Sequence, residues 1–347
     1  MLKKQNIYTH TKKMHAVVRK YLHERYYIIE RKSEGMPAKT IDFIKGHMGG
    51  NEIILLYGDQ VPKGEEIQLA QKLLSRPNIR GDETGFFYKL EKGGDLKVKI
   101  AEIGESQFIP MCGGLTQVLG VALLETDFAE HFGIKVEEPT TKITLETDVG
   151  FIPLEIENKA GTVTRVWTHM KAYVDYCYKL GVQPVRVLGV DAIKVGDYLV
   201  VNGDDVKNVY DDVDFEEMNE SALQTLTKMS SEFRAQLYNT SSALCLYDLH
   251  PEHRGDARAV FPCNIPIGHI EPSCGTGTTA IGIAMIEHRE MRVKEGAAKA
   301  LIECGGKPTL GGPNIAEFRA TVKNGKVVNA KICHNLIEIL ATGKICF

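Results

Sequence analysis

The sequence has 347 residues, of which 43% are hydrophobic and 25% charged, and its net charge at pH 7 is −3. This composition is that of a soluble globular protein with one large domain or, as we expect, two ordinary ones. The nearly balanced charge does not indicate nucleic acid or an anionic membrane as a partner, and no apolar run is long enough to span a bilayer. No signal peptide is recognisable at the N-terminus, so we expect a cytoplasmic protein.

Residues 1–38 form a basic segment with a net charge of +6, from nine Lys or Arg and three Glu. Apolar residues recur at roughly helical spacing between Val17 and Arg31. The segment is therefore predicted to be a helical extension. A basic amphipathic helix can bind a membrane or an RNA, but we favour a helix that packs on the body of the protein or on a second subunit.

After Pro37 the sequence changes to short runs typical of strands, joined by glycine turns. We expect residues 39–140 to form a first α+β half and residues 141–347 a second, whose last strands can cross back to the first. The strand predictions are Ile41–Ile44, Glu52–Leu56, Phe86–Leu90, Leu96–Ile100, Ile143–Thr147, Phe151–Ile156, Asp197–Asn202, Glu317–Val322 and Val327–Ile332. The helix predictions are Glu65–Leu74 and Glu220–Leu237.

The segment from Asp204 to Glu220 is strongly acidic, with eight acidic residues and one lysine. A calcium site is conceivable, but the spacing matches no calcium-binding loop, so we favour a solvated loop. The eight cysteines include no Cys-x-x-Cys pair, and no His-Glu-x-x-His motif is present. The sequence therefore predicts neither a disulfide framework nor a metal site.

An internal repeat is the most informative feature of the sequence. The fourteen residues from Cys112 to Glu125 align with those from Cys274 to Glu287, and six positions are identical. The two copies lie 162 residues apart, about half the chain, which indicates a duplicated half. A single cysteine in such a setting would usually be structural, but two in matching contexts indicate a functional pair.

Each copy places a cysteine before small residues and an apolar helix-forming run. The start of a helix presents free N–H groups and a partial positive charge, which binds anions and favours thiolate over thiol. Gly120 and Gly282 fall in the middle of these helices, so we expect the two helices to pack side by side. The run Gly275-Thr-Gly could instead be a phosphate loop, but the lysine and the dinucleotide spacing of such loops are missing.

Two thiols on opposite faces of a substrate suit the inversion of a carbon centre. A thiolate removes the α-proton from one face, and a thiol returns a proton to the other face. The charge that develops on the substrate carboxylate must be stabilised, and two helix N-termini can do so. The pattern therefore predicts an amino-acid racemase or epimerase.

The sequence resembles the family of diaminopimelate epimerase and the proline and hydroxyproline racemases over roughly residues 40–345. Phe43-Ile-Lys-Gly-His-Met-Gly-Gly-Asn51-Glu-Ile53 is similar to the epimerase opening Phe-x-Lys-Met-His-Gly-x-Gly-Asn-Asp-Phe. Met111-Cys-Gly-Gly114 resembles the first catalytic motif, and Ser273-Cys-Gly-Thr-Gly-Thr278 the second.

This resemblance implies two similar α+β halves, each a curled mixed sheet around a central helix. It implies that Cys112 and Cys274 are the catalytic bases and that neither pyridoxal phosphate nor a metal is required. We also expect a small amino-acid substrate and a homodimer. The implied substrate-binding residues are Asn51, Gly113, Gly114, Gly275, Thr276 and Gly277.

The sequence departs from the epimerases at the residues that bind the distal group of diaminopimelate. Ile265-Pro-Ile267 lies about where those enzymes have a Glu-Arg pair, and Gly196-Asp-Tyr198 replaces their Asn-Pro-His segment. Diaminopimelate is therefore not the expected substrate. The alternatives are a double-bond isomerase of a small di- or tricarboxylate, and a non-catalytic amino-acid-binding protein.

Overall fold

The computed structural model describes residues 40–213, 220–237, 243–263, 269–304 and 314–346. Residues 41–344 form one compact unit. The basic helix predicted within residues 1–38 lies outside the described residues.

The order of strands and helices repeats once along the compact unit. The first set is β1 (Thr40–Met48), β2 (Asn51–Tyr57), α2 (Glu66–Leu74), β3 (Glu83–Lys89), β4 (Leu96–Glu102), β5 (Phe108–Ile109), α3 (Gly113–Glu125), β6 (Thr140–Thr147), β7 (Gly150–Lys159) and β8 (Thr162–His169). The second set is β10 (Val190–Val195), β11 (Tyr198–Asn202), α7 (Glu220–Leu237), β12 (Ala243–Asp248), β13 (Ala257–Cys263), β14 (His269–Glu271), α8 (Gly275–Glu287), β15 (Gly296–Cys304), β16 (Asn314–Lys323) and β17 (Lys326–His334). The other described elements are η1 (Gly58–Gln60), α4 (Phe128–Phe132), α5 (Lys171–Leu180), β9 (Val182–Val187), α6 (Gly203–Lys207) and β18 (Ile337–Cys346).

The strand pairing repeats together with this order. In the first set β2 is antiparallel to β1 and parallel to β3, and β4 is antiparallel to β3 and parallel to β6. The second set has the same pairs, with β11 between β10 and β12, and β13 between β12 and β15. Pairing of β8 with β17 joins the two sets. The predicted fold class, α+β with mixed sheets in two similar halves, is confirmed.

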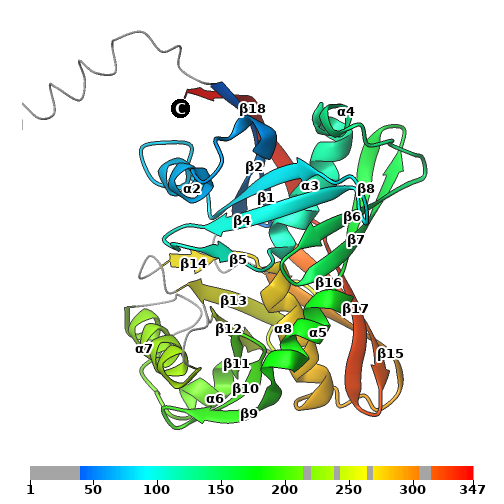
Figure 1. Ribbon diagram of the computed structural model, residues 1–347. Helices are drawn as coiled ribbons and strands as arrows, with labels where there is room; N and C mark the ends of the chain where they lie inside the picture. Colours follow the sequence, from blue (N-terminus) through cyan, green and yellow to red (C-terminus); the bar gives the residue numbers. More distant parts are fainter. Residues whose placement is uncertain (1–39, 214–219, 238–242, 264–268, 305–313, 347) are drawn as a thin grey trace, which may run out of the picture. The chain divides into compact units, whose positions relative to one another are not determined.

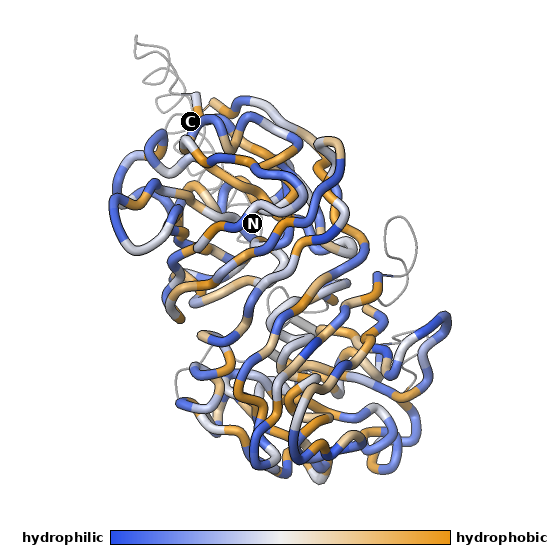
Figure 2. The backbone as a smooth tube through the Cα atoms, turned by 90° about the vertical axis from the view of Figure 1, so that its right-hand side faces the viewer, coloured by the Kyte–Doolittle hydropathy of each residue, from blue (hydrophilic) through white to orange (hydrophobic). Residues whose placement is uncertain are grey.

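The two halves each hold one central helix, and both helices have 13 residues (Figure 1). Helix α3 contacts β2, β7 and β8, while α8 contacts β11, β12, β16 and β17. Their residues 113–123 and 275–286 are all buried. A helix that is apolar on every side needs this enclosure, and buried residues alternate with more exposed ones along β7 and β16, two of the strands that supply it. Figure 2 shows hydrophobic and hydrophilic residues interspersed along the backbone.

The glycines in the middle of these helices have a different role from the one predicted. A Cβ atom on Gly120 would lie 2.5 Å from the Val166 side chain of β8, and one on Gly282 would lie 2.6 Å from Phe318 of β16. These glycines therefore let each helix approach its own sheet, and the expectation of side-by-side helices was wrong. The two helices approach each other at their first residues instead.

Outside the central helices, most predicted elements are present with similar bounds. Helix α7 has the predicted range, and every predicted strand overlaps an observed one. The acidic segment differs from the expected loop, because it begins with α6, whose N-cap Asn202 accepts a hydrogen bond from the backbone of Asp204. Among the described helices, none has the length and apolar content needed to cross a membrane. The division at residue 140 stays a prediction; it falls at the start of β6, which pairs with β4.

Candidate active site

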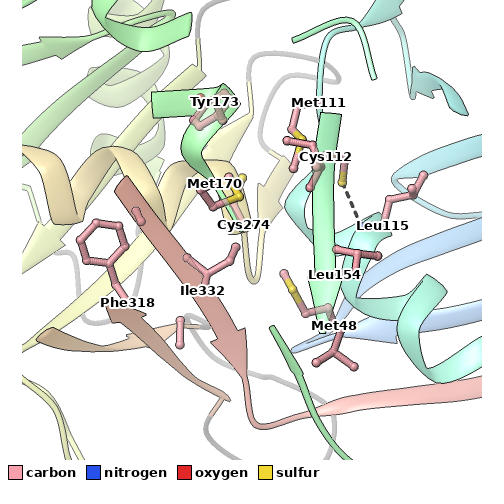
Figure 3. Packing of buried hydrophobic residues seen from close by; sticks show 14 of the residues in the cluster. Met48, Met111, Cys112, Leu115, Leu154, Met170, Tyr173, Cys274, Phe318 and Ile332 are labelled. Atoms are coloured by element: carbon pink, nitrogen blue, oxygen red, sulfur yellow. Dashed lines mark hydrogen bonds between the residues drawn. The ribbon is translucent and has the colours of Figure 1, made fainter. Parts of the chain in front are cut away.

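Cys112 and Cys274 occupy the same structural position in the two halves. Each is the N-cap of its central helix, with backbone angles φ −133°, ψ 117° at Cys112 and φ −136°, ψ 119° at Cys274. The Cys112 sulfur accepts a hydrogen bond of 3.3 Å from Leu115 N–H (Figure 3). The Cys274 sulfur accepts one of 3.4 Å from Gly277 N–H. The sulfur thus replaces the side-chain oxygen that usually caps a helix at this position.

The first residues of the two helices lie against each other. A Cβ atom on Gly113 would lie 2.6 Å from the Cα atom of Gly275, a distance that real Cβ atoms do not show. Each helix leaves the N–H groups of its first turn without helical acceptors, and each carries a partial positive charge at this end. The structure thus brings together the predicted residues of both first turns, which are Gly113, Gly114, Gly275, Thr276 and Gly277.

Tyr198, at the start of β11, contacts the second thiol and was not among the predicted site residues. Its hydroxyl lies 2.7 Å from Thr276 Oγ1 and 3.5 Å from the Cys274 sulfur. Thr276 Oγ1 lies 3.4 Å from the same sulfur. Burial raises the pKa of Tyr198 well above its ordinary value, so the hydroxyl keeps its proton and can donate. Cys274 is therefore surrounded by more donors than Cys112.

Asn51, predicted from the resemblance to bind substrate, lies beside the segment that precedes Cys274. It follows the two-residue turn Gly49-Gly50, in which both residues have positive φ, +58° and +94°. Glycine is the residue best suited to such a turn, and a side chain on Gly49 would also collide with Asn314. The fully buried Asn51 amide donates to Ser273 O at 3.0 Å and to Glu271 Oε1.

Two buried glutamates, Glu83 on β3 and Glu271 on β14, influence the thiols: the charges of both act on Cys112, and that of Cys274 acts on Glu271. The glutamates are 6% and 9% exposed, and neither was predicted as a site residue. Burial raises the pKa of each carboxyl well above its ordinary value; the charge of the other glutamate adds to this at Glu83, and that of Cys274 adds to it at Glu271. Comparison of the residues before the two cysteines could have pointed to Glu271, because Ile109 occupies the matching place.

The pKa values of the two thiols differ from the sequence-based expectation. Burial raises the pKa of Cys112 well above its ordinary value, and the charge of Glu83 raises it further. Burial also raises the pKa of Cys274, although hydrogen bonds from Thr276, Tyr198 and Gly277 oppose the rise. The expectation of lowered thiol pKa values was wrong because the loss of hydration outweighs the hydrogen bonds at the start of each helix.

The described residues were also compared with what a metal ion needs as ligands. Among the residues that the structure describes, no group of three or more His, Cys, Asp or Glu side chains could hold a metal ion. The groups available for chemistry in the described site are two thiols, two carboxyls, a phenol, the Thr276 hydroxyl, an amide and the backbone N–H groups of two helices.

Comparison with solved structures identifies the fold. The chain is similar to a hydroxyproline epimerase from Agrobacterium vitis with bound trans-4-hydroxy-L-proline, at a TM-score of 0.63 and 15% identity, covering 88% of this chain and 91% of that one. It is similar to a probable proline racemase from Agrobacterium radiobacter, at a TM-score of 0.60 and 15% identity, covering 88% and 93%. A methylitaconate-delta-isomerase gives a TM-score of 0.53 at 14% identity, covering 88% and 95%. No protein-family model and no curated protein matches the chain.

These likenesses extend over nearly the whole of each solved chain, so they concern both halves of the compact unit. The chain has the fold that these racemases, epimerases and isomerases share. The fold expected from the cysteine motifs is confirmed.

Proposed function

We propose that this protein is an amino-acid racemase or epimerase that inverts the α-carbon with Cys112 and Cys274 and needs no pyridoxal phosphate or metal. One observation carries the proposal: two thiols cap two helices that meet at their first residues. The same backbone geometry recurs at both thiols, so each one lies at the start of a helix.

The chemistry follows from that arrangement. One thiolate sulfur takes the α-proton as the Cα–H bond breaks, and the bonding electron pair moves into the substrate carboxylate. The other thiol then gives its proton to the opposite face of the α-carbon. The N–H groups of both first turns stabilise the carboxylate most strongly when this extra charge develops, which is how preorganised dipoles lower a barrier.

The donors around the two sulfurs assign them different acidities. Cys274 lies near Tyr198, Thr276 and the Gly277 N–H, whereas Cys112 accepts from the Leu115 N–H. Hydrogen bonds donated to a thiolate stabilise it and so lower the pKa of the thiol. Cys274 is therefore proposed as the more acidic of the two thiols, the one that carries the thiolate when one of the pair is ionised, and Cys112 as its protonated partner.

Deuterium incorporation tests the proposal. The common amino acids, including proline and trans-4-hydroxyproline, are incubated with the protein in D₂O, in both configurations. A two-thiol reaction places deuterium in the first product formed, while the unreacted substrate keeps its hydrogen. Cys112→Ser and Cys274→Ser should each abolish inversion in a folded protein. The absence of exchange for every amino acid, or inversion by either variant at the wild-type rate, would refute the proposal.

A double-bond isomerase of a small di- or tricarboxylate is the second candidate. It is favoured by the similarity of the fold to methylitaconate-delta-isomerase. Such an enzyme would shift the double bond of an amine-free acid in the same D₂O experiment and would leave amino acids unchanged. A non-catalytic binding protein would exchange neither class. The homodimer and the cytoplasmic location stay predictions.

A further inference from the structure

The repeat allows the two halves to be compared residue by residue around the thiols. Asn51 and Tyr198 correspond, because each begins the second strand of a hairpin after a two-residue turn, paired with Met48 and Val195 respectively. Two positions further on, Ile53 pairs with Glu83 and Val200 pairs with Cys245. Glu83 of the first half therefore corresponds to Cys245 of the second.

The two buried carboxyls near the thiols, Glu83 and Glu271, have no acidic counterpart in the other half. Glu83 corresponds to Cys245, and Glu271, three residues before Cys274, corresponds to Ile109, three residues before Cys112. The capping thiols and the helix geometry are the same in the two halves, whereas these polar groups differ. Inversion moves the hydrogen from one face of the α-carbon to the other. The site must nevertheless distinguish the amino group of the substrate from its carboxylate. Residues that differ between the two repeated halves can make this distinction.

Two acceptor atoms in this group have no hydrogen-bond partner within the described part of the chain. They are Glu83 Oε2 and Asn51 Oδ1, and both side chains are more than nine-tenths buried. The Asn51 amide connects the two carboxyls, because it donates to Glu271 and also lowers the pKa of Glu83 through a hydrogen bond. A buried acceptor without a partner costs about 1–3 kcal/mol, so a binding partner that donates hydrogen bonds is expected here.

The ionisable groups that act on these acceptors include three carboxyls, which a bound cation would favour in their charged forms. The charges that act most strongly on Glu83 belong to Glu271, Asp82 and Glu102, and all three raise its pKa. A cation placed among them would be attracted, whereas an additional carboxylate would be repelled. The first turns of the two helices offer the opposite polarity, since they present N–H groups. The site thus has one acceptor side and one donor side.

We propose that Glu83 and Asn51, with Glu271 bonded to the Asn51 amide, bind the cationic amino group of the substrate. The substrate class is then an α-amino acid with a primary or ring-secondary ammonium group, and amine-free di- and tricarboxylates are poor ligands. The ammonium donates to Glu83 Oε2 and Asn51 Oδ1, while the carboxylate accepts from the helix N-termini. This inference rests on the proposed function and specifies the substrate that it acts on.

Kinetics of a matched set of variants test the proposal. The substrate is the amino acid that exchanges fastest in D₂O, and its competitor is the hydroxy acid with the same carbon skeleton. The variant Glu83→Gln keeps the shape of the side chain and removes its charge. The control Glu66→Gln removes another buried carboxyl of the same half, one that pairs with Lys99 at 2.9 Å.

Glu83→Gln should raise KM for the amino acid by about 10- to 100-fold, the size of a hydrogen bond to a charged group. It should bind the hydroxy acid as well as the wild type does, so that the preference for the amine is reduced by the same factor. Its melting temperature should not fall, because the buried carboxyl, which forms no ion pair among the residues that the structure describes, is replaced by a neutral amide. Glu66→Gln should leave KM within about twofold, as expected for a change away from the substrate.

An unchanged KM in Glu83→Gln, or a wild-type protein that binds the hydroxy acid more tightly than the amino acid, would overturn the ammonium site. Neither result contradicts the two-thiol reaction, because the cysteine variants test that reaction separately. A protein that exchanges no amino acid would refute the proposed function, and this inference with it.

Discussion

Gly113 and Gly275, the first residues of α3 and α8, lie so close that a Cβ atom on either would come within 2.6–2.7 Å of the Cα atom of the other. The contact is backbone against backbone, so no flexible side chain can move to make room. Gly113→Ala should therefore destabilise the protein by about 3 kcal/mol, at the upper end for an overpacked core. It should also lower turnover, because the two capping thiols move with their helices.

The next residue offers a matched control for this substitution. A Cβ atom on Gly114 would meet the end of the flexible Met48 side chain at 3.4 Å, an ordinary contact. Gly114→Ala should therefore be neutral or should stabilise the helix by up to about 1 kcal/mol. Urea denaturation of both variants measures the difference. Equal stability of the two proteins would show that the helix ends can separate without cost.

Tyr198→Phe should raise the pKa of Cys274, since it removes a hydroxyl from the immediate surroundings of the sulfur. Alkylation by a small reagent, followed by mass spectrometry across a pH series, reports on each cysteine separately. In the wild type Cys274 should react at lower pH than Cys112, and in the variant this difference should shrink. The kcat/KM should fall by the same factor in both directions, because the fixed equilibrium constant between the two configurations equals the ratio of the two kcat/KM values. A wild-type protein in which Cys112 reacts first would contradict the assignment of Cys274 as the more acidic thiol.

Acid should destabilise the protein through His334, a fully buried residue whose pKa burial lowers to about 3. Below the unfolded pKa of about 6.5 the unfolded chain binds a proton that the folded chain does not, so stability is lost as the pH falls from 6.5 towards 3. By pH 4.5 this loss amounts to about 2–3 kcal/mol.

Denaturation curves at pH 7 and pH 4.5 measure this loss. Comparison with His334→Leu isolates the histidine from the buried carboxyls, whose raised pKa values act in the opposite direction. The same substitution at His131, which is 31% exposed, provides a control that should lose stability in acid as the wild type does. If His334→Leu loses as much stability in acid as the wild type, His334 is not responsible.

Deletion of residues 1–38 should leave the α-proton exchange rate within a few-fold of the full chain. The residues proposed for catalysis all belong to the compact unit of residues 41–344. The association state of the truncated protein, measured by light scattering, can change if the segment contacts a second subunit. Loss of all turnover in a folded truncation would show that the basic segment helps to form the site.

The repeat around the cysteines was sufficient to predict the central helices and the place of both thiols. Such a pattern is local, because a helix start and its apolar run lie within fourteen residues. The burial of Glu83 could not be predicted from a local pattern of this kind. In the sequence Glu83 follows another acidic residue, Asp82, and nothing distinguishes it from a surface carboxylate. Its burial depends on the parallel pairing of β2 with β3, which joins residues thirty positions apart.

The thiol pKa values and the mid-helix glycines illustrate a second limit. The sequence indicates the hydrogen bonds at the start of a helix, but it does not show how deeply the sulfur is buried, and burial determines the direction of the shift. Gly120 and Gly282 do mark close contacts, as predicted, but their contacts are with strands of their own half. Tyr198 was recognised as a departure from the epimerases and could be connected to Cys274 only by the structure.

The capping bonds of Cys112 and Cys274 have a consequence for inhibitors. The sulfur that would carry the proton is also the acceptor that holds the Leu115 or Gly277 N–H in place. A covalent inhibitor that occupies either sulfur removes that acceptor, so the first turn of the attached helix loosens as the enzyme is inactivated. Faster amide hydrogen exchange at Leu115 or Gly277 would then reveal which thiol had reacted.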